Sequence, residues 1–330
     1  MTLVEILVST AILMLLMAII LGVTNQTGRL WRQSSSKIAS FQDARAAFEA
    51  LTRNLSQATL NHYYDYYDDK WDRRDPASTS FVPSNYGRYS DLHFLCGPAD
   101  TLFDSSTLGT KQSHAVFFQA PLGRVSDKTT YPDSNTLINA LGYYVQFSDN
   151  KASLARPKFL QGSSSVDQMR FRLMEWMQPS EKFRLYDSTL MAADPKGWYK
   201  TLATNTDQCH VMADNILALI VLPESAPGDT TLAPGYSYDS RPATYDPVRS
   251  HILPPLLQVT LVAIDRDSAK ILDTRYQGSQ PPLYLSSWFR SAASYSSDVT
   301  QMENTLQGGT GGPKVAYRVF STTISTRDNK

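Results

Sequence analysis

The N-terminal segment constrains this chain more than any other part of its sequence. Between Leu3 and Leu21 the only charged residue is Glu5, and the other polar residues are Ser9 and Thr10. Nineteen helical residues, each rising 1.5 Å, would cover about 28 Å, close to the roughly 30 Å hydrocarbon core of a bilayer. A helix in a soluble core is rarely apolar on every side for about five turns. We therefore predict that this segment crosses a membrane.

A cleaved secretory signal is the main alternative for such a segment. Signal peptides carry basic residues before the apolar run and an Ala-x-Ala-like cleavage site after it. Here the acidic Glu5 lies near the start, and the sequence Leu-Gly-Val-Thr-Asn-Gln-Thr-Gly follows from Leu21 to Gly28. Both features favour a retained membrane helix.

The carboxylate of Glu5 is the most informative side chain of the segment. An ionisable group within an apolar span is energetically costly, so we expect it to have a partner and a function. The nearest positive group is the α-amine of Met1, about one helical turn away. In an assembly, the amine of a neighbouring subunit would serve equally well.

The segment Met-Thr-Leu-Val-Glu-Ile-Leu-Val resembles the start of mature type IV pilins and of type II secretion pseudopilins. That family has Thr2, Leu3, an aliphatic residue and then Glu5, followed by an unbroken apolar helix. The resemblance covers about the first 25 residues. It implies cleavage by a prepilin peptidase, N-methylation of Met1, and assembly through Thr2, Leu3 and Glu5. Met1 departs from the family, which usually has Phe there.

Basic residues after the span bear on its orientation. Arg29, Arg32 and Lys37 would draw the following chain toward the cytoplasm, whereas pilins orient the other way, through a short basic leader before the span. No leader precedes Met1, so we expect the numbering to start at the mature chain. The alternative is that Met1 is a true initiator and the chain an unprocessed anchor.

A second helical stretch follows the apolar one, and its apolar residues recur every three or four positions. We expect this stripe to pack against a globular head and the charged residues beside it to face solvent or a neighbouring subunit. The chain is then predicted to have three segments: the membrane half of the helix at 1–28, the amphipathic half at 29–60 and the head at 61–330. The stripe comprises Ile38, Phe41, Ala44, Phe48, Leu51 and Leu55, and the charged residues are Arg45, Glu49 and Arg53.

The head has mainly strand signals, with alternation that predicts antiparallel sheets with one solvated face. A helix is expected at Asp298–Gln307, and the proline-rich segment 223–255 is expected to be largely loop. The fold class is therefore α+β, and the resemblance implies the type IV pilin fold. The predicted strands are Asp91–Cys96, Ala115–Gln119, Gly142–Phe147, Arg170–Trp176, Ile216–Leu222, Leu257–Ile264 and Ala316–Ile324.

Two further resemblances concern the head. Residues Tyr317–Ile324 resemble the closing strand of the large minor pseudopilins of the J and W types. Together with Asn215–Pro223 and Pro254–Asp265, this strand looks like the Verru_Chthon cassette protein C family. These are pilin-like proteins grouped with other pilin-like partners.

Two cysteines, Cys96 and Cys209, leave two alternatives open. In an exported head they would be able to form a disulfide, which would close a long loop. Two free, buried thiols are the other reading, and sequence separation does not decide between them.

Four carboxylates lie close together in the segment Asp65, Asp68, Asp69 and Asp72. Such oxygen ligands suit Ca²⁺, but the EF-hand pattern and its glycine are absent. A solvated acidic turn over packed aromatics is the favoured reading. The interleaved aromatics, which equally suit a subunit contact, are Tyr63, Tyr64, Tyr66, Tyr67 and Trp71.

Composition and motifs argue against two function classes. The chain has 31 basic and 31 acidic residues, whereas a nucleic-acid binder normally has a basic face. The five histidines have no metal-site spacing, Cys209-His210 point to opposite faces of a strand, and no nucleophile or phosphate-loop motif occurs. We therefore expect neither an enzyme nor a nucleic-acid partner.

The leading expectation is a structural subunit of a type IV pilus-like or type II secretion pseudopilus-like filament. It would reside in the inner membrane by one span and then enter a periplasmic or extracellular filament with copies of itself or other pilin-like subunits. Glu5 would neutralise the N-terminal amine of an adjacent subunit. The alternative is a single-pass anchored adhesin that does not polymerise.

Overall fold

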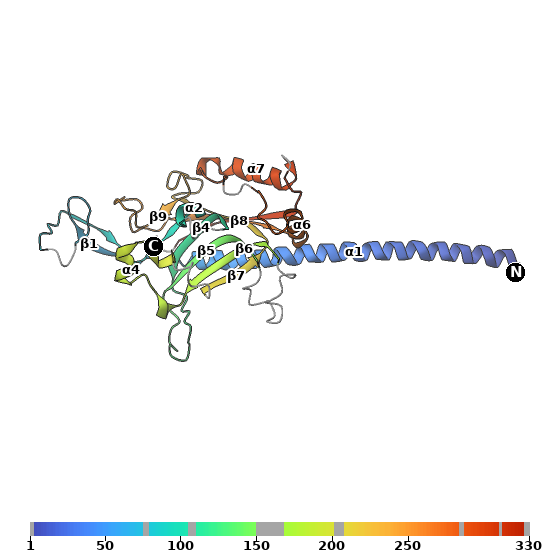
Figure 1. The fold of residues 1–330 in the computed structure, drawn as a ribbon, viewed down its shortest axis with the longest axis horizontal. Coiled ribbons are helices and arrows are strands. Elements are labelled where there is room, and N and C mark those ends of the chain that lie inside the picture. The colour runs from blue at the N-terminus through green and yellow to red at the C-terminus, as the bar shows by residue number, and fades with distance from the viewer. Residues whose placement is uncertain are drawn as a thin grey trace.

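A computed structural model describes residues 3–74, 79–104, 110–149, 168–200, 208–283, 287–309 and 312–326. It contains one very long helix, whose first half projects from a head built of antiparallel sheets and short helices (Figure 1). The predicted α+β class is confirmed.

Helix α1 (Leu3–Leu55) is a single element of 53 residues, which corresponds to about 80 Å of rise. It continues without a break through Gly22 and Gly28 and ends five residues before the predicted boundary at residue 60. Within it, Ile6–Trp31 is long and apolar enough to cross a membrane, and none of its most apolar stretch is buried in the head.

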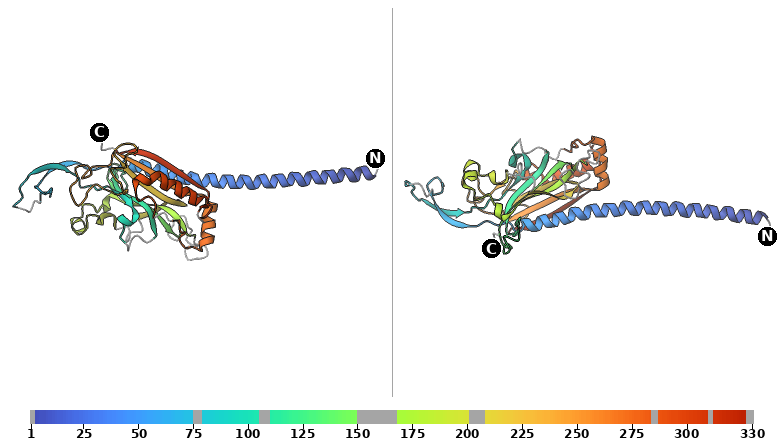
Figure 2. Two further views of the ribbon diagram at one scale, coloured as in Figure 1. Left: turned by 90° about the horizontal axis from the view of Figure 1, so that it is seen from above. Right: turned by 60° about the horizontal axis from the view of Figure 1, so that its bottom comes forward.

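Two antiparallel sheets form the body of the head, and a separate two-stranded hairpin projects from it (Figure 2). The larger sheet has the order β7-β6-β5-β4-β3-β9, with β7 (Cys209–Asp214), β6 (Arg170–Gln178), β5 (Asn139–Ser148), β4 (Lys111–Ala120), β3 (Leu95–Pro98) and β9 (Tyr238–Asp239). The smaller sheet has the order β11-β10-β8, with β11 (Tyr317–Ser325), β10 (Leu256–Ile264) and β8 (Ile216–Glu224). The hairpin pairs β1 (Tyr63–Tyr67) with β2 (Asn85–Tyr89).

Short helices connect and cover these strands. They are α2 (Ala99–Leu102), α4 (Ser188–Ala193), α5 (Gly197–Lys200), α6 (Arg266–Tyr276) and α7 (Tyr295–Leu306), with 3-10 turns at Ser180–Lys182 and Ala292–Ser294. The predicted helix at Asp298–Gln307 corresponds to α7, whereas α6 was not predicted from the sequence.

Each predicted strand has a counterpart, but the prediction for Asp91–Cys96 is only partly correct. The strand begins at Leu95, because the backbone N–H groups of His93 and Phe94 donate to the side chains of Gln119 and Ser240 instead of joining a ladder. The proline-rich segment is largely loop between β8 and β10, as expected, apart from β9.

The expectation of one solvated sheet face is wrong for the central strands, since β4, β5 and β8 are buried on both faces. On one side of β4, the Phe117 ring stacks on Tyr199 of α5, with 4.3 Å between centroids. On the other side, the Phe118 ring lies 6.1 Å from that of Tyr143, whose hydroxyl accepts a hydrogen bond from Asn54 of α1. Strand β11, at the edge of the smaller sheet, keeps an alternating exposed face.

Charged residues of β6 that were expected to face water are buried with partners. The Arg170 guanidinium lies 2.9 Å from Asp273 of α6, and Arg172 donates to Asp214 at 2.8 Å. Glu175 accepts a hydrogen bond from the Tyr143 hydroxyl at 2.7 Å. Pairing of this kind offsets the cost of removing these groups from water.

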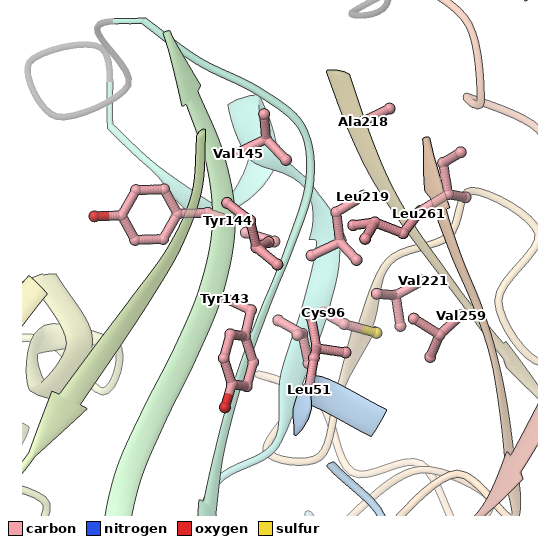
Figure 3. Close-up of a cluster of buried hydrophobic side chains, with 14 of the residues drawn as sticks. Leu51, Cys96, Tyr143, Tyr144, Val145, Ala218, Leu219, Val221, Val259 and Leu261 are labelled. Atoms are coloured by element: carbon pink, nitrogen blue, oxygen red, sulfur yellow. The ribbon is translucent and has the colours of Figure 1, made fainter. Parts of the chain in front are cut away.

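The second half of α1 packs on the head through the predicted stripe. Ala44, Phe48, Leu51 and Leu55 are buried, and the Phe48 ring lies 6.0 Å from that of Phe320 on β11. Figure 3 shows Leu51 in one cluster with side chains of β3, β5, β8 and β10. Beside the stripe, Arg45 and Glu49 form an exposed ion pair at 2.8 Å, as the four-residue spacing predicts.

Side chains of β4 join the two sheets by continuing the ladder of β8. Gln112 donates to the Leu217 carbonyl at 3.1 Å, and the Leu219 N–H donates to Ser113 Oγ at 3.1 Å. The Val221 N–H donates to Nδ1 of His114 at 3.2 Å. The β8 edge is therefore satisfied by a neighbouring sheet without a neighbouring strand.

Leu51→Ala tests the contact between helix and head. Leu51 is fully buried, so we expect the free energy of unfolding to fall by about 2–5 kcal/mol, measured by urea denaturation in detergent. The control is Arg45→Ala, whose side chain is 71% exposed and which should change stability by no more than about 0.5 kcal/mol. Equal effects of the two variants would contradict this packing.

Acid should destabilise the head through His114. Its Nδ1 accepts from Val221 and its Nε2 lies 3.0 Å from the Phe289 carbonyl, so the ring is held neutral, and burial lowers its pKa from 6.5 to about 4. Between those values the unfolded chain binds a proton that the folded chain does not, so stability is complete above pH 6.5 and falls as the pH drops toward 4. The expected loss is on the order of 3 kcal/mol.

Urea denaturation between pH 7 and pH 4 measures this loss. Burial also lowers the pKa of His251 to about 4, so that ring contributes in the same direction. His114→Gln should therefore reduce the pH slope without abolishing it, and an unchanged slope would refute the assignment to His114.

Candidate functional site

The N-terminal half of α1 exposes a long apolar surface. Leu3, Leu13, Met14 and Trp31 are each more than 60% exposed, and apolar side chains cover every side of the helix between them. Contiguous apolar surface of this size is not stable in water and marks a site that meets lipid or protein.

The predicted assembly residues lie at the free end of this surface. Leu3 is 78% exposed at the first turn of α1. Met1 and Thr2 lie outside the described residues, and for Glu5 the structure describes only the helical backbone. The pairing of Glu5 with an N-terminal amine stays a prediction.

The β1–β2 hairpin forms a second exposed surface, at the end of the molecule opposite the N-terminus (Figures 1 and 2). Tyr64, Tyr66 and Tyr86 share its outer face and are each at least half exposed. The Tyr64 and Tyr86 rings stack at 5.4 Å, and the Tyr66 ring lies 5.3 Å from Tyr86. The hairpin thus presents a continuous aromatic face to solvent.

Contacts on the opposite face stabilise the hairpin. Arg73 lies 3.8 Å from the centroid of the Tyr89 ring and donates to Asp65 at 2.7 Å, and this hydrogen bond lowers the pKa of Asp65. Trp71 stacks on Tyr245 of the proline-rich segment at 3.9 Å. The sequence did not predict the contributions of β2 and Tyr245, because β2 is short and has no period-2 alternation of its tyrosines.

Two carboxylates of the acidic segment have partners within the protein. Asp65 pairs with Arg73, and Asp68 Oδ1 accepts from the backbone N–H groups of Lys70 and Asp72 at 2.9 and 2.8 Å. Asp69 and Asp72 are exposed. In the described part of the chain no group of three or more His, Cys, Asp or Glu residues is arranged to hold a metal. Asp65 and Asp68 thus have partners within the protein, and Ca²⁺ binding by this segment stays a prediction.

The disulfide considered between Cys96 and Cys209 is also wrong. Both thiols are free, with Cys96 buried on β3 and Cys209 half-buried on β7. Strands β4, β5 and β6 lie between them in the sheet. Four steps of about 4.8 Å place the two backbones roughly 19 Å apart, well beyond the ~7 Å that a disulfide spans.

A buried polar cluster surrounds His93. Its Nε2 lies 2.7 Å from Asp239 Oδ1, and Trp198 Nε1 donates to its Nδ1 at 3.2 Å. Both ring nitrogens are therefore occupied, and burial lowers the pKa of His93 even though Asp239 opposes the shift. This arrangement leaves no nitrogen for proton transfer to a substrate.

A scan against protein-family models, a search of curated proteins and a search of solved structures each return no match for this chain. The case for a function therefore depends on the residues and geometry given above.

Proposed function

We propose that this chain is a structural subunit of a type IV pilus-like or type II secretion pseudopilus-like filament, with the type IV pilin fold. The observation that carries the proposal is the division of α1 into an apolar, fully exposed half and a half packed across a β-rich head. The resemblance of residues 1–8 to mature pilins supports it.

The two halves of α1 explain how one chain can exist in two environments. Before assembly, the apolar half lies in the inner membrane, where the backbone N–H and C=O groups are satisfied by hydrogen bonds within the helix. In the filament the same side chains exchange lipid for the helices of neighbouring subunits. The head then forms the outer surface, in the periplasm or outside the cell.

In this mechanism, Glu5 fixes the register between adjacent subunits of the filament. A carboxylate in the apolar filament core requires a partner, and the N-terminal amine of the adjacent subunit, generated by prepilin peptidase and methylated at Met1, neutralises it. Its partners are copies of this chain or other pilin-like subunits. The head of about 270 residues is large for a major subunit and favours a minor one, in line with the J- and W-type and Verru_Chthon cassette protein C resemblances.

Glu5→Ala tests the mechanism. The variant should still insert in the membrane, since it loses only a charge, but filaments counted by negative-stain microscopy in the presence of its partner subunits should fall at least about tenfold. Thr10→Ala is the matched control, because the Thr10 hydroxyl bonds only to its own helix at Leu7. Normal filaments from Glu5→Ala would refute the role of the carboxylate.

A single-pass anchored adhesin remains the second candidate, favoured by the exposed tyrosines at the end of the head opposite α1. Exposed aromatic faces of this kind suit glycans or protein surfaces. In this case the chain would not polymerise.

Mass spectrometry of the mature N-terminus separates the two candidates. The filament proposal expects N-methylated Met1, because assembly-competent pilins are processed there. An unmodified or formylated Met1 would favour the anchored adhesin and contradict the filament proposal.

A further inference from the structure

Helix α6 occupies a distinctive place in the head. It lies at the end of the head nearest the N-terminal half of α1 and runs across the long axis of the molecule (Figures 1 and 2). Asp265 caps it by accepting from the Ser268 N–H at 2.8 Å, and its buried residues Ser268, Ala269 and Leu272 face the head. Its other face points away from the head.

That outer face carries three basic residues and one apolar residue, together with the carboxylate of Asp267. Arg266, Lys270 and Arg275 are exposed, and among the described residues none of the three forms an ion pair. Between them lies Ile271, which is 54% exposed. Asp273 is already neutralised by Arg170, which leaves Asp267 as the exposed carboxylate of α6.

More positive charge lies beside α6, where the chain enters β11. Lys314 and Arg318 are exposed there, and the Ala316 N–H between them donates to Ser268 of α6 at 2.8 Å. A groove of about 830 Å³ next to α6 brings Asp43 of α1 near Arg266 and Lys270. Basic side chains therefore outnumber acidic ones on the elements that face the N-terminal end.

The apolar half of α1 holds this basic face close to the level of a membrane. From Trp31, the end of the apolar segment, to Asp43, beside α6, is a rise of about 18 Å. The head sits to one side of α1 in Figure 2. Membrane helices tilt by about 20° on average and by up to about 40°, and a tilt toward α6 lowers its outer face to the lipid headgroups.

We propose that α6 contacts the membrane surface: Arg266, Lys270 and Arg275 bind anionic phospholipid headgroups while Ile271 enters the interfacial region of the bilayer. Charge complementarity selects anionic lipid as the occupant. Because α6 is tethered through α1 to the membrane segment, it experiences a high effective concentration of lipid at the bilayer surface. The contact sets the tilt of the head before assembly. This inference rests on the proposed membrane anchoring of α1 and not on polymerisation.

The test uses the full chain in nanodiscs of phosphatidylcholine, with or without phosphatidylglycerol, and follows amide hydrogen exchange of α6. With phosphatidylglycerol, exchange at 266–276 should slow by at least about threefold, since headgroup binding suppresses local opening. High salt should reverse the protection, because it screens exposed charges. Equal exchange in both kinds of nanodisc would overturn the inference.

A charge-reversal pair links the protection to the basic face. Lys270→Glu with Arg275→Glu should remove the effect of phosphatidylglycerol. The control, Arg88→Glu with Lys128→Glu, reverses two exposed charges on the hairpin and on the loop after β4 and should leave the effect intact. Protection that survives the first pair would also overturn the inference.

The outcomes separate this inference from the proposed function. A chain that does not enter nanodiscs refutes the anchoring on which both depend. A chain that enters nanodiscs but shows no lipid-dependent protection of α6 refutes only the proposed contact of α6 with lipid. Protection that appears solely on polymerisation, whatever the lipid, would assign α6 to a subunit contact instead.

Discussion

The packing of α1 on the head is the contact on which the rest of this molecule depends. Leu51 and Leu55 are fully buried, and Asn54 between them donates to Tyr143, which in turn donates to Glu175. Apolar burial supplies the energy of this contact, and the buried hydrogen bonds make its register specific. Because α1 continues unbroken from this contact into its apolar half, whatever holds that half also positions the head.

The two ends of the head have different chemistry as a result. The end nearest the apolar half of α1 carries the basic outer face of α6, whereas the far end carries the aromatic hairpin. If α1 is anchored in a membrane as proposed, the hairpin faces away from that membrane and α6 faces toward it.

Local sequence patterns predicted a large part of this fold. The apolar run, the stripe of α1 and the strands all correspond to observed elements, because each has a strong period of its own. The patterns failed where a distant segment supplied the partner. Arg170 and Arg172 alternate like solvated residues, yet both are buried and paired with Asp273 and Asp214. Likewise, the sequence did not show that Asp65 pairs with Arg73, or that Asp68 accepts hydrogen bonds from nearby backbone N–H groups.

By itself, the sequence determined that this chain has one apolar helix of membrane-spanning length, an amphipathic continuation and a β-rich head, since hydrophobic periodicity is a local property. Only the tertiary structure decided that Cys96 and Cys209 lie on strands too far apart to pair. The same holds for the stacking of Trp71 on Tyr245 and for the end of the head at which α6 lies. Those outcomes depend on strand order and on contacts between distant segments, which no local pattern encodes.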